Sequence, residues 1–343
     1  MKVTKNPSLK AFNTFRVEAS AGLMLTLETE EDLLSLPPFD PGKDFILGDG
    51  SNVLFTTDVP GTLFHNRISG REIVKTGDDH AWVEAGAGEN WHELVRWTLK
   101  NKLSGLENLS LIPGLAGAAP IQNIGAYGVE LATVLESVTA WDLVRSTWKM
   151  FSREDCGLAY RDSRFKAAEP DRYLITSIRL RLDRHYKPQL EYAGLREELS
   201  RLNIRHPTAI EVSDAVIRLR QHKLPDPATS GNAGSFFKNP VLKRDESEAL
   251  LARFPELPAW PLDDGTIKLS AAWMIEHCGL KGYRTGDAGI SDRHALVIVN
   301  HGSATGGEIL QLVRTIQSTV HDTFGVMLEP EPRIVDFSID LPT

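Results

Sequence analysis

The sequence predicts an α+β protein of two or three domains. Its 343 residues are enough for that number of domains and for a sizeable core. Strand-like and helix-like patterns follow one another without regular β–α–β alternation, which argues against a doubly wound parallel sheet. The sequence contains no internal repeat and no low-complexity tract. A proline break, Pro225-Asp226-Pro227, is a candidate domain boundary.

Strand patterns dominate the first part of the chain. Strands are expected over residues 23–27, 46–47, 53–55, 71–76, 81–86, 135–142, 146–151 and 173–182. Between them, Thr29 and Asp32 open a short helix in the manner of a capping box. Asn90 and Glu93 mark the start of a second helix, because an asparagine side chain can accept a hydrogen bond from the first turn.

Helix signals become more frequent after residue 200. Thr208 and Glu211 predict the start of a helix that runs to about Lys223, and Pro225 stops it because proline cannot continue the hydrogen-bond pattern. Further elements are expected over residues 269–278 (helix), 295–300 (strand), 305–324 (helix, capped by Thr305 and Glu308) and 326–337 (strand).

The composition excludes several classes of protein. A net charge of −8 argues against a surface for nucleic acid or for an anionic membrane. Two cysteines, Cys156 and Cys278, fit a reducing compartment. The N-terminal sequence lacks the apolar region of a signal peptide, and no run approaches membrane-spanning length. We therefore expect a cytoplasmic protein.

Common cofactor and metal motifs are absent from the sequence. Gly48 and Gly50 are followed by Val53 instead of the third glycine of a Rossmann dinucleotide-binding motif. There is no Walker loop and no nucleophile elbow. The 10 histidines show no metal-ligand spacing, so no metal site is expected.

Two glycine-rich segments together favour a nucleotide or flavin cofactor. Gly48-Asp49-Gly50-Ser51-Asn52 separates two short strands, and the backbone N–H groups of such a loop can surround an anion. Residues 112–128 combine glycine, alanine and proline with almost no charge, so this backbone could lie against a ring or a pyrophosphate. Read alone, the first segment is more simply an ordinary turn, and the second could be the tight packing of two elements.

The run GNAGSFFKNP over residues 231–240 is the most informative stretch. Its two phenylalanines would anchor Ser235 in apolar surroundings, although composition alone favours a tight turn that Ser235 merely caps. Arg161, in AYRDS, could hold a carboxylate or form a surface salt bridge. Glu331, in LEPEPR, could serve acid–base chemistry or cap a strand, and Lys223 could be a solvated lysine.

Taken in order, these segments resemble those of the UDP-N-acetylenolpyruvoylglucosamine reductases. The matching motifs are NTF (residues 13–15), GDGSNVLF, AGAGENWHELV, GLENLSLIPGLAGAAPIQNIGAYG, YRDSRFK, KLPDP, GNAGSFFKNP and LEPEPR, which cover nearly the whole chain. The resemblance implies a vanillyl-alcohol-oxidase/PCMH-type FAD-binding fold of two subdomains plus an inserted α+β substrate-binding domain. The implied boundaries are 1–69 for the first subdomain, 70–224 plus 325–343 for the second, and 225–324 for the inserted domain.

The resemblance also implies an NADPH-consuming reaction of non-covalently bound FAD. NADPH delivers a hydride to the flavin N5, which passes it to the vinyl carbon of UDP-N-acetylglucosamine enolpyruvate. Ser235 then protonates the adjacent carbon, and Arg161 and Glu331 stabilise the enolate, giving UDP-N-acetylmuramate for peptidoglycan synthesis. Because a carboxylate beside that charge helps only if protonated or hydrogen-bonded, Glu331 is expected to have a raised pKa.

The remaining site residues are also assigned by resemblance. The FAD contacts fall on Gly48, Gly50, Ser51, Asn52, Pro113, Gly114, Gly117, Pro120, Gln122, Asn123, Ile124 and Gly125, and the substrate contacts on Tyr127, Tyr192, Lys223 and Asn239. Ser235 and the LEYAG segment indicate the longer form of the family, although Ala193 stands where glycine is expected and Pro332 follows Glu331. We expect a monomer whose partners are NADPH and the sugar nucleotide, without nucleic acid or membrane.

Overall fold

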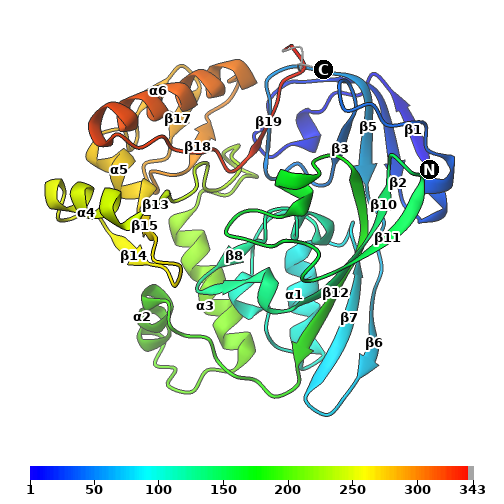
Figure 1. Ribbon diagram of the computed structural model, residues 1–343, viewed down its shortest axis with the longest axis horizontal. Helices are drawn as coiled ribbons and strands as arrows, with labels where there is room; N and C mark the ends of the chain where they lie inside the picture. Colours follow the sequence, from blue (N-terminus) through cyan, green and yellow to red (C-terminus); the bar gives the residue numbers. More distant parts are fainter. Residues whose placement is uncertain (339–343) are drawn as a thin grey trace.

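A computed structural model describes residues 1–338, without the side chain of residue 193. Six α-helices occur in this part of the chain, and Figure 1 labels them. They are α1 (Trp91–Lys100), α2 (Ala193–Arg201), α3 (Ala209–Lys223), α4 (Arg244–Arg253), α5 (Ala271–His277) and α6 (Gly306–Phe324). None of the helices within residues 1–338 is both long enough and apolar enough to cross a membrane.

The first sheet is built from the N-terminal segment. Its order is β1 (Lys2–Lys5), β2 (Ala21–Leu27), β5 (Val59–Asn66) and β3 (Phe45–Leu47). Strands β2 and β3 run parallel to β5, whereas β1 is antiparallel to β2. Beside this sheet, the last strand, β19 (Arg333–Val335), pairs in parallel with β4 (Val53–Phe55). The chain therefore returns to its N-terminal segment at its end.

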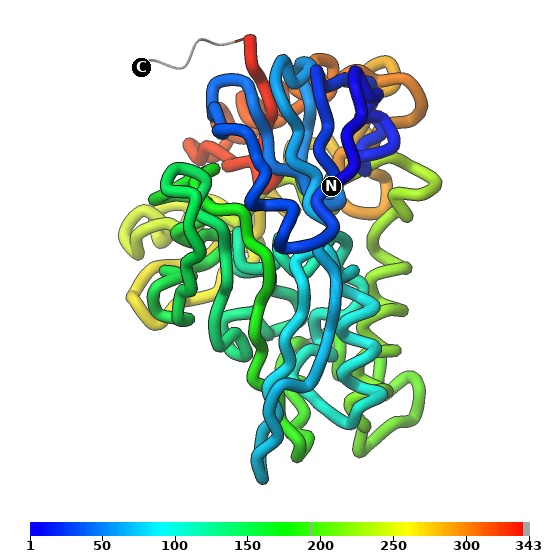
Figure 2. The backbone as a smooth tube through the Cα atoms, turned by 90° about the vertical axis from the view of Figure 1, so that its right-hand side faces the viewer, coloured from blue at the N-terminus to red at the C-terminus, as the bar shows by residue number. Residues whose placement is uncertain are grey.

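The second sheet is five-stranded and wholly antiparallel. Its order is β11 (Thr147–Ser152), β10 (Leu135–Asp142), β12 (Tyr173–Asp183), β7 (His80–Gly86) and β6 (Arg71–Thr76). The apolar side of α1 shares one core with this sheet, including the fully buried Trp91 and Leu94. Figure 2 shows the β6–β7 hairpin reaching the end of the molecule opposite the first sheet. Helix α3 lies beside α1, joined to it by the Arg96–Asp214 salt bridge.

The third part of the fold combines two small sheets with α4, α5 and α6. One sheet has the order β13 (Val241–Leu242), β15 (Ile267–Leu269), β14 (Ala259–Pro261), and the other β16 (Arg284–Thr285), β17 (Ala288–Ile290), β18 (Ile298–Asn300). A two-stranded piece, β8 (Gly125–Ala126) with β9 (Val129–Glu130), lies in the glycine-rich segment.

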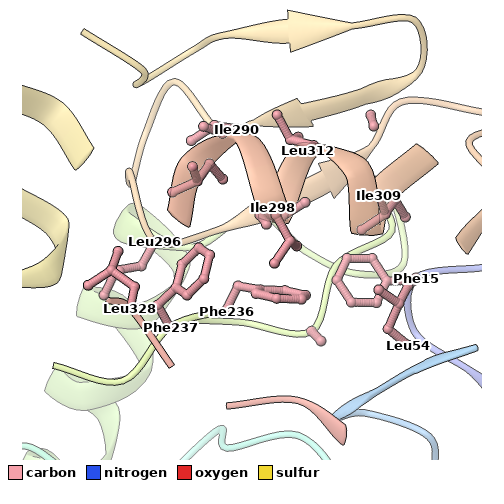
Figure 3. Close-up of a cluster of buried hydrophobic side chains, with 14 of the residues drawn as sticks. Phe15, Leu54, Phe236, Phe237, Ile290, Leu296, Ile298, Ile309, Leu312 and Leu328 are labelled. Carbon is pink, nitrogen blue, oxygen red and sulfur yellow. The ribbon is translucent and has the colours of Figure 1, made fainter. Parts of the chain in front are cut away.

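The third part and the N-terminal segment share one hydrophobic core. Phe15 and Leu54 pack with side chains from β17, β18 and α6, as Figure 3 shows. The contact is close, because a Cβ on Gly306 at the start of α6 would lie 1.7 Å from the carbonyl oxygen of Phe55. The third part is therefore held tightly against the N-terminal segment.

Most of the expected elements are confirmed, but the helix expected to open at Thr29 and Asp32 is only a 3-10 turn, Glu31–Ser35, without a side-chain cap. Asn90, Thr208 and Thr305 each cap a helix with a side-chain hydrogen bond, as expected. The strand expected over residues 326–337 is wrong in extent, since only Arg333–Val335 is a strand. Pro330 and Pro332 explain this, because proline has no N–H to give to a sheet. The strand expected over residues 295–300 is likewise shorter, beginning at Ile298.

Some elements carry no clear pattern in the sequence. Strands β1 and β5, and helices α2 and α4, were not expected. The pairing of β19 with β4 also attaches residues 333–335 to the segment 1–69, although 325–343 was expected to belong with residues 70–224. The domain boundaries themselves stay a prediction.

Candidate active site

The first glycine loop is shaped by the N-terminal segment that packs against it. Gly50 has a φ of +62°, and a Cβ there would lie 2.0 Å from the carbonyl oxygen of Phe12. Only glycine fits such a position. The backbone N–H of Thr14 donates to the Gly50 carbonyl at 3.1 Å. The Asn13-Thr14-Phe15 motif thus holds the backbone of this loop in place.

The two glycine-rich segments meet in space. A Cβ on Gly114, whose φ is +110°, would lie 2.6 Å from Ser51 Oγ. Asn52 Nδ2 donates to Gln122 Oε1 at 2.7 Å. The loop 48–52 and the segment 112–128 therefore form one continuous surface, which sequence reading alone left open.

Some residues of the second glycine-rich segment are used for packing and hydrogen bonds within the protein. At Gly117 a Cβ would lie 2.4 Å from the Cβ of Ala87, so tight packing of two elements applies there. Ile124 is buried in the core beneath the five-stranded sheet, and Pro120 is buried with it. The Asn123 side chain donates to Glu130 and to the Ala159 carbonyl, and it accepts from the Ala132 N–H. Asn123 therefore supports the turn that carries Arg161, and only its backbone is free for a cofactor.

Arg161 and Glu331 lie together although 170 positions separate them in sequence. Arg161 Nε is 3.4 Å from Glu331 Oε1, and Arg161 Nη2 donates to the Gly125 carbonyl at 2.7 Å. The Glu331 N–H donates to the Phe236 carbonyl at 2.7 Å, next to Ser235. Asn52 Nδ2 also approaches the Glu331 carbonyl, at 3.4 Å. The segments around Arg161, Ser235 and Glu331 thus meet both glycine-rich segments at one site.

Ser235 is held in place by its neighbours. Phe236 and Phe237 are fully buried in the core that Figure 3 shows, as the sequence predicted. The Phe236 N–H donates to the Leu296 carbonyl at 2.7 Å, and Ser235 itself forms a β-bridge with Val297. The half-buried Ser235 side chain therefore stands on a fixed backbone at the edge of the core.

The charge state of Glu331 reflects a balance between burial and nearby cations. Burial raises the pKa of the Glu331 carboxyl, which is the direction expected from the sequence. The cations of Arg161, Lys166 and Lys238 act in the opposite direction and lower that pKa. Lys238 is itself paired with Glu329 at 2.5 Å. A carboxyl that retains its proton more readily than usual can donate a hydrogen bond to a neighbouring anion.

The expected substrate residues form a second group. The rings of Tyr127 and Tyr192 meet edge to face at 5.0 Å between centroids, and Lys223 Nζ lies 5.8 Å from the Tyr192 centroid. Asn239 lies apart from this group: its Oδ1 accepts from the Ala271 N–H at the start of α5. The structure therefore brings Tyr127, Tyr192 and Lys223 together, whereas the Asn239 side chain is bonded to the start of α5.

A cavity of about 940 Å³ lies between the start of α1 and residues 111–113 on one side and the third part of the fold on the other. It is lined by Leu111–Pro113, by the end of α3 and the proline break, by Asn232 and Gly234, and by residues between 282 and 301. Pro113 is thus the predicted cofactor residue that lines it directly.

Sequence reading missed two charged residues of this region. Arg220 lines the cavity, its Nε donates to the Leu111 carbonyl at 3.1 Å, and within residues 1–338 it has no carboxylate in salt-bridge distance. The second is Lys166, whose burial lowers the pKa of its ammonium group. The available signals were the position of Arg220 one turn before Lys223 and that of Lys166 in YRDSRFK. In residues 1–338, no three His, Cys, Asp or Glu side chains group as a metal site requires.

Comparisons with known proteins agree with this geometry. Residues 226–335 match the model of the UDP-N-acetylenolpyruvoylglucosamine reductase C-terminal domain, and residues 44–148 match an FAD-binding domain. Reductases of that name from Flavobacterium johnsoniae and Xanthomonas euvesicatoria are 43% and 47% identical, over 98% and 97% of this chain and 100% and 96% of theirs. The crystal structure of the Thermus caldophilus reductase superimposes with a TM-score of 0.67 at 27% identity, covering 97% of this chain and 98% of the other. The chain belongs to the UDP-N-acetylenolpyruvoylglucosamine reductase family.

Proposed function

We propose that this chain catalyses the NADPH-dependent reduction of UDP-N-acetylglucosamine enolpyruvate to UDP-N-acetylmuramate in peptidoglycan precursor synthesis, with FAD as its cofactor. The family to which it belongs supports this activity. The observation that carries the proposal is the Arg161–Glu331 pair beside residues 235–236, hydrogen-bonded to both glycine-rich segments. The proposal includes the longer family form, in which Tyr192 contacts substrate and Ser235 is the proton donor.

The residues present fit a bound dinucleotide flavin. At Gly50 and Gly114 a side chain would collide with Phe12 or Ser51, so the backbone is bare where the two segments meet. Arg220, which faces the cavity without a carboxylate partner in residues 1–338, can neutralise a phosphate. We assign the FAD contacts to Gly48–Asn52 and to residues 113–125. FAD held there would supply the two-electron chemistry that links NADPH to the vinyl carbon of the substrate.

Ser235 completes the reduction by giving a proton to the carbon next to the vinyl carbon. A neutral hydroxyl is a weak acid, but it can protonate a strongly basic enolate carbon that lies within hydrogen-bond reach. The buried Phe236 and Phe237 hold the serine backbone in place. The hydride and this proton together saturate the double bond.

Arg161 and Glu331 stabilise the negative charge that develops on the substrate carboxylate. The Arg161 guanidinium offers donors in a planar fork that suits a carboxylate. Glu331, with its raised pKa, adds a hydrogen bond when it is protonated and avoids placing a second negative charge there. Loss of one such preorganised donor typically costs about 100-fold or more in rate.

The sugar nucleotide is proposed to bind to Lys223, Tyr127, Tyr192 and Asn239. The ammonium of Lys223 suits a diphosphate, and the two aromatic rings offer apolar surface to the uridine.

We further propose that the protein works as a cytoplasmic monomer whose partners are small molecules only. Size-exclusion chromatography with light scattering, at micromolar protein concentration, should give a mass near 38.0 kDa. A mass of twice that value or more would contradict the monomer.

One anaerobic experiment tests the activity against its rivals. The purified protein is reduced with NADPH while flavin absorbance is followed, and the enolpyruvyl sugar nucleotide is then added. We expect bleaching, followed by rapid reoxidation on addition of the substrate. Reoxidation by oxygen alone would indicate an oxidase of the same fold. Absence of bleaching would indicate a non-catalytic binding protein.

A further inference from the structure

Lys166 reaches the catalytic centre from a rigid turn. It lies in the π-helical turn Arg164–Ala168, which starts after Ser163. Ser163 Oγ donates to the Ile121 carbonyl at 2.6 Å, and Phe165 is buried in the core. From this anchored position Lys166 Nζ approaches the carbonyl oxygen of Arg161 at 3.4 Å.

The carbonyl that Lys166 contacts belongs to a strained residue. Arg161 has a φ of +54°, in the left-handed region that non-glycine residues rarely adopt. Such a conformation costs on the order of 1 kcal/mol or more and persists only when the surroundings impose it. Ala159 and Asp162 exchange two backbone hydrogen bonds around the turn. The Lys166 ammonium adds a charged contact at the strained residue itself.

The basic residues around Glu331 differ in whether they are paired with a carboxylate. Arg161 pairs with Glu331 directly, and Lys238 is already paired with Glu329. Lys166 has no carboxylate within salt-bridge distance among residues 1–338. It faces Glu331, Glu329 and Asp162 at longer range, together with the like charge of Lys238. Tyr160, whose pKa is raised by burial, also faces Glu331.

We propose that Lys166 is a positioning residue of this active site: its ammonium group fixes the backbone of Arg161 and shares control of the protonation of Glu331. The inference rests on the proposed function, because it assigns Lys166 to the reaction of Arg161 and Glu331. Lys166 acts through those two residues and needs no contact of its own with substrate. Its positive charge holds the pKa of Glu331 below the value that burial alone would give.

Two substitutions separate the contact from the charge. Lys166→Met removes both, whereas Lys166→Gln keeps a hydrogen-bond donor without the charge. Lys166→Arg retains the charge and should restore both properties. Lys149→Met is the matched control, because Lys149 lies over the Phe151 ring nearby, with its ammonium near the Tyr173 hydroxyl rather than the site.

The direct measurement is a carbon-13 NMR titration of the Glu331 carboxyl in the FAD-loaded protein, with Glu331→Gln used to assign the signal. Lys166→Met and Lys166→Gln should both move the titration midpoint upward, whereas Lys166→Arg and Lys149→Met should leave it in place. An unchanged midpoint in Lys166→Gln would overturn the electrostatic part of the proposal. This readout does not depend on turnover.

The kinetic measurement follows flavin reoxidation by the enolpyruvyl sugar nucleotide across pH. Lys166→Met should slow this step about 10- to 100-fold, because a small misplacement of a catalytic group has effects of that size. Lys166→Gln should lose less rate, and its alkaline limb should move upward together with the NMR midpoint. Lys166→Met at the wild-type rate would refute the positioning role. A wild-type protein that the substrate fails to reoxidise would refute the proposed function instead, while the NMR result would still decide the effect on Glu331.

Discussion

The two sides of the site differ in how they are held. On the side proposed for catalysis, Arg161 and Glu331 bond to each other and to the backbone of distant segments. On the side proposed for substrate binding, Tyr192 is 40% exposed, and the contacts that join it to Tyr127 and Lys223 are aromatic and cation–π contacts. The catalytic side is thus preorganised for one charge distribution. The substrate side can adapt to a large ligand, so substitutions on the two sides should have different kinetic consequences.

On the proposed substrate side, the side chain of Asn108 bonds to the backbone of two segments. Asn108 is buried and donates through Nδ2 to the carbonyls of Tyr127 and Gln189, both at 2.9 Å. It thereby ties the second glycine-rich segment to the loop that leads to Tyr192. These bonds position the start of the loop, whereas the Tyr192 ring beyond it is exposed.

The largest effect is expected from Ser235→Ala on the catalytic side. Reoxidation of the reduced flavin by the enolpyruvyl substrate should slow about 100- to 10,000-fold, because a general acid contributes that much. Reduction of the flavin by NADPH should proceed at nearly the wild-type rate, since it needs no proton from this serine. Stopped-flow absorbance measures both halves in one preparation. If both remain fast, Ser235 has only the structural role of a turn residue.

The next largest effect is expected from substitution of Glu331, which should also change the pH dependence of flavin reoxidation. Glu331→Ala should lower the reoxidation rate about 100-fold, whereas Glu331→Gln, which keeps a donor, should retain most of it. Because the protonated carboxyl is the useful form, the wild-type rate should fall as pH rises through the raised pKa of Glu331. That alkaline limb should disappear in Glu331→Gln. The control is Glu248→Gln, an exposed carboxylate on α4 that pairs with Arg244. Full activity in Glu331→Ala would refute the assignment.

Much of the fold could be predicted because its signals are local. The caps at Asn90, Thr208 and Thr305 lie within three residues of the groups that they bond. The convergence of Arg161 with Glu331 is not local, because it depends on how β19 returns to β4. Only the resemblance to a family indicated that these two residues share a site.

The residues that sequence reading missed share a physical reason. Arg220 and Lys166 are long basic side chains in segments rich in other charges, where a solvated position is the usual expectation. What distinguishes them is burial against backbone carbonyls, of Leu111 and Arg161 respectively, and that depends on tertiary packing. Conversely, Asn123 matched a cofactor position, yet its side chain is used within the protein.

A smaller effect is expected from Gly114→Ala, which tests how closely the two glycine-rich segments must meet. The new methyl group would lie 2.6 Å from Ser51 Oγ at a φ of +110°, so the serine hydroxyl must turn away and the backbone is strained. A strain of about 1 to 3 kcal/mol corresponds to roughly 5- to 150-fold weaker FAD binding. Flavin fluorescence on titration of the apoprotein measures this.

Gly70→Ala is the matched control for that experiment. Gly70 has a φ of +132°, but apart from its chain neighbours no atom of residues 1–338 lies within 4 Å of the position of its Cβ. It therefore carries the backbone strain without the collision and lies outside the two cofactor segments. Equal loss of FAD affinity in both variants would show that strain, and not the contact with Ser51, decides the effect.

The smallest effect is expected on the adaptable side, from Tyr192. Tyr192→Ala removes the aromatic surface that is proposed to contact the uridine, and an aromatic contact of this kind is worth about 0.5 to 1.5 kcal/mol. The KM for the sugar nucleotide should rise roughly 2- to 12-fold, with kcat nearly unchanged. Tyr192→Phe keeps the ring and should behave as wild type, and Trp148→Ala, at another exposed aromatic, is the control. A fall in kcat with constant KM would show that Tyr192 belongs to the preorganised side, and the contrast between the two sides would then fail.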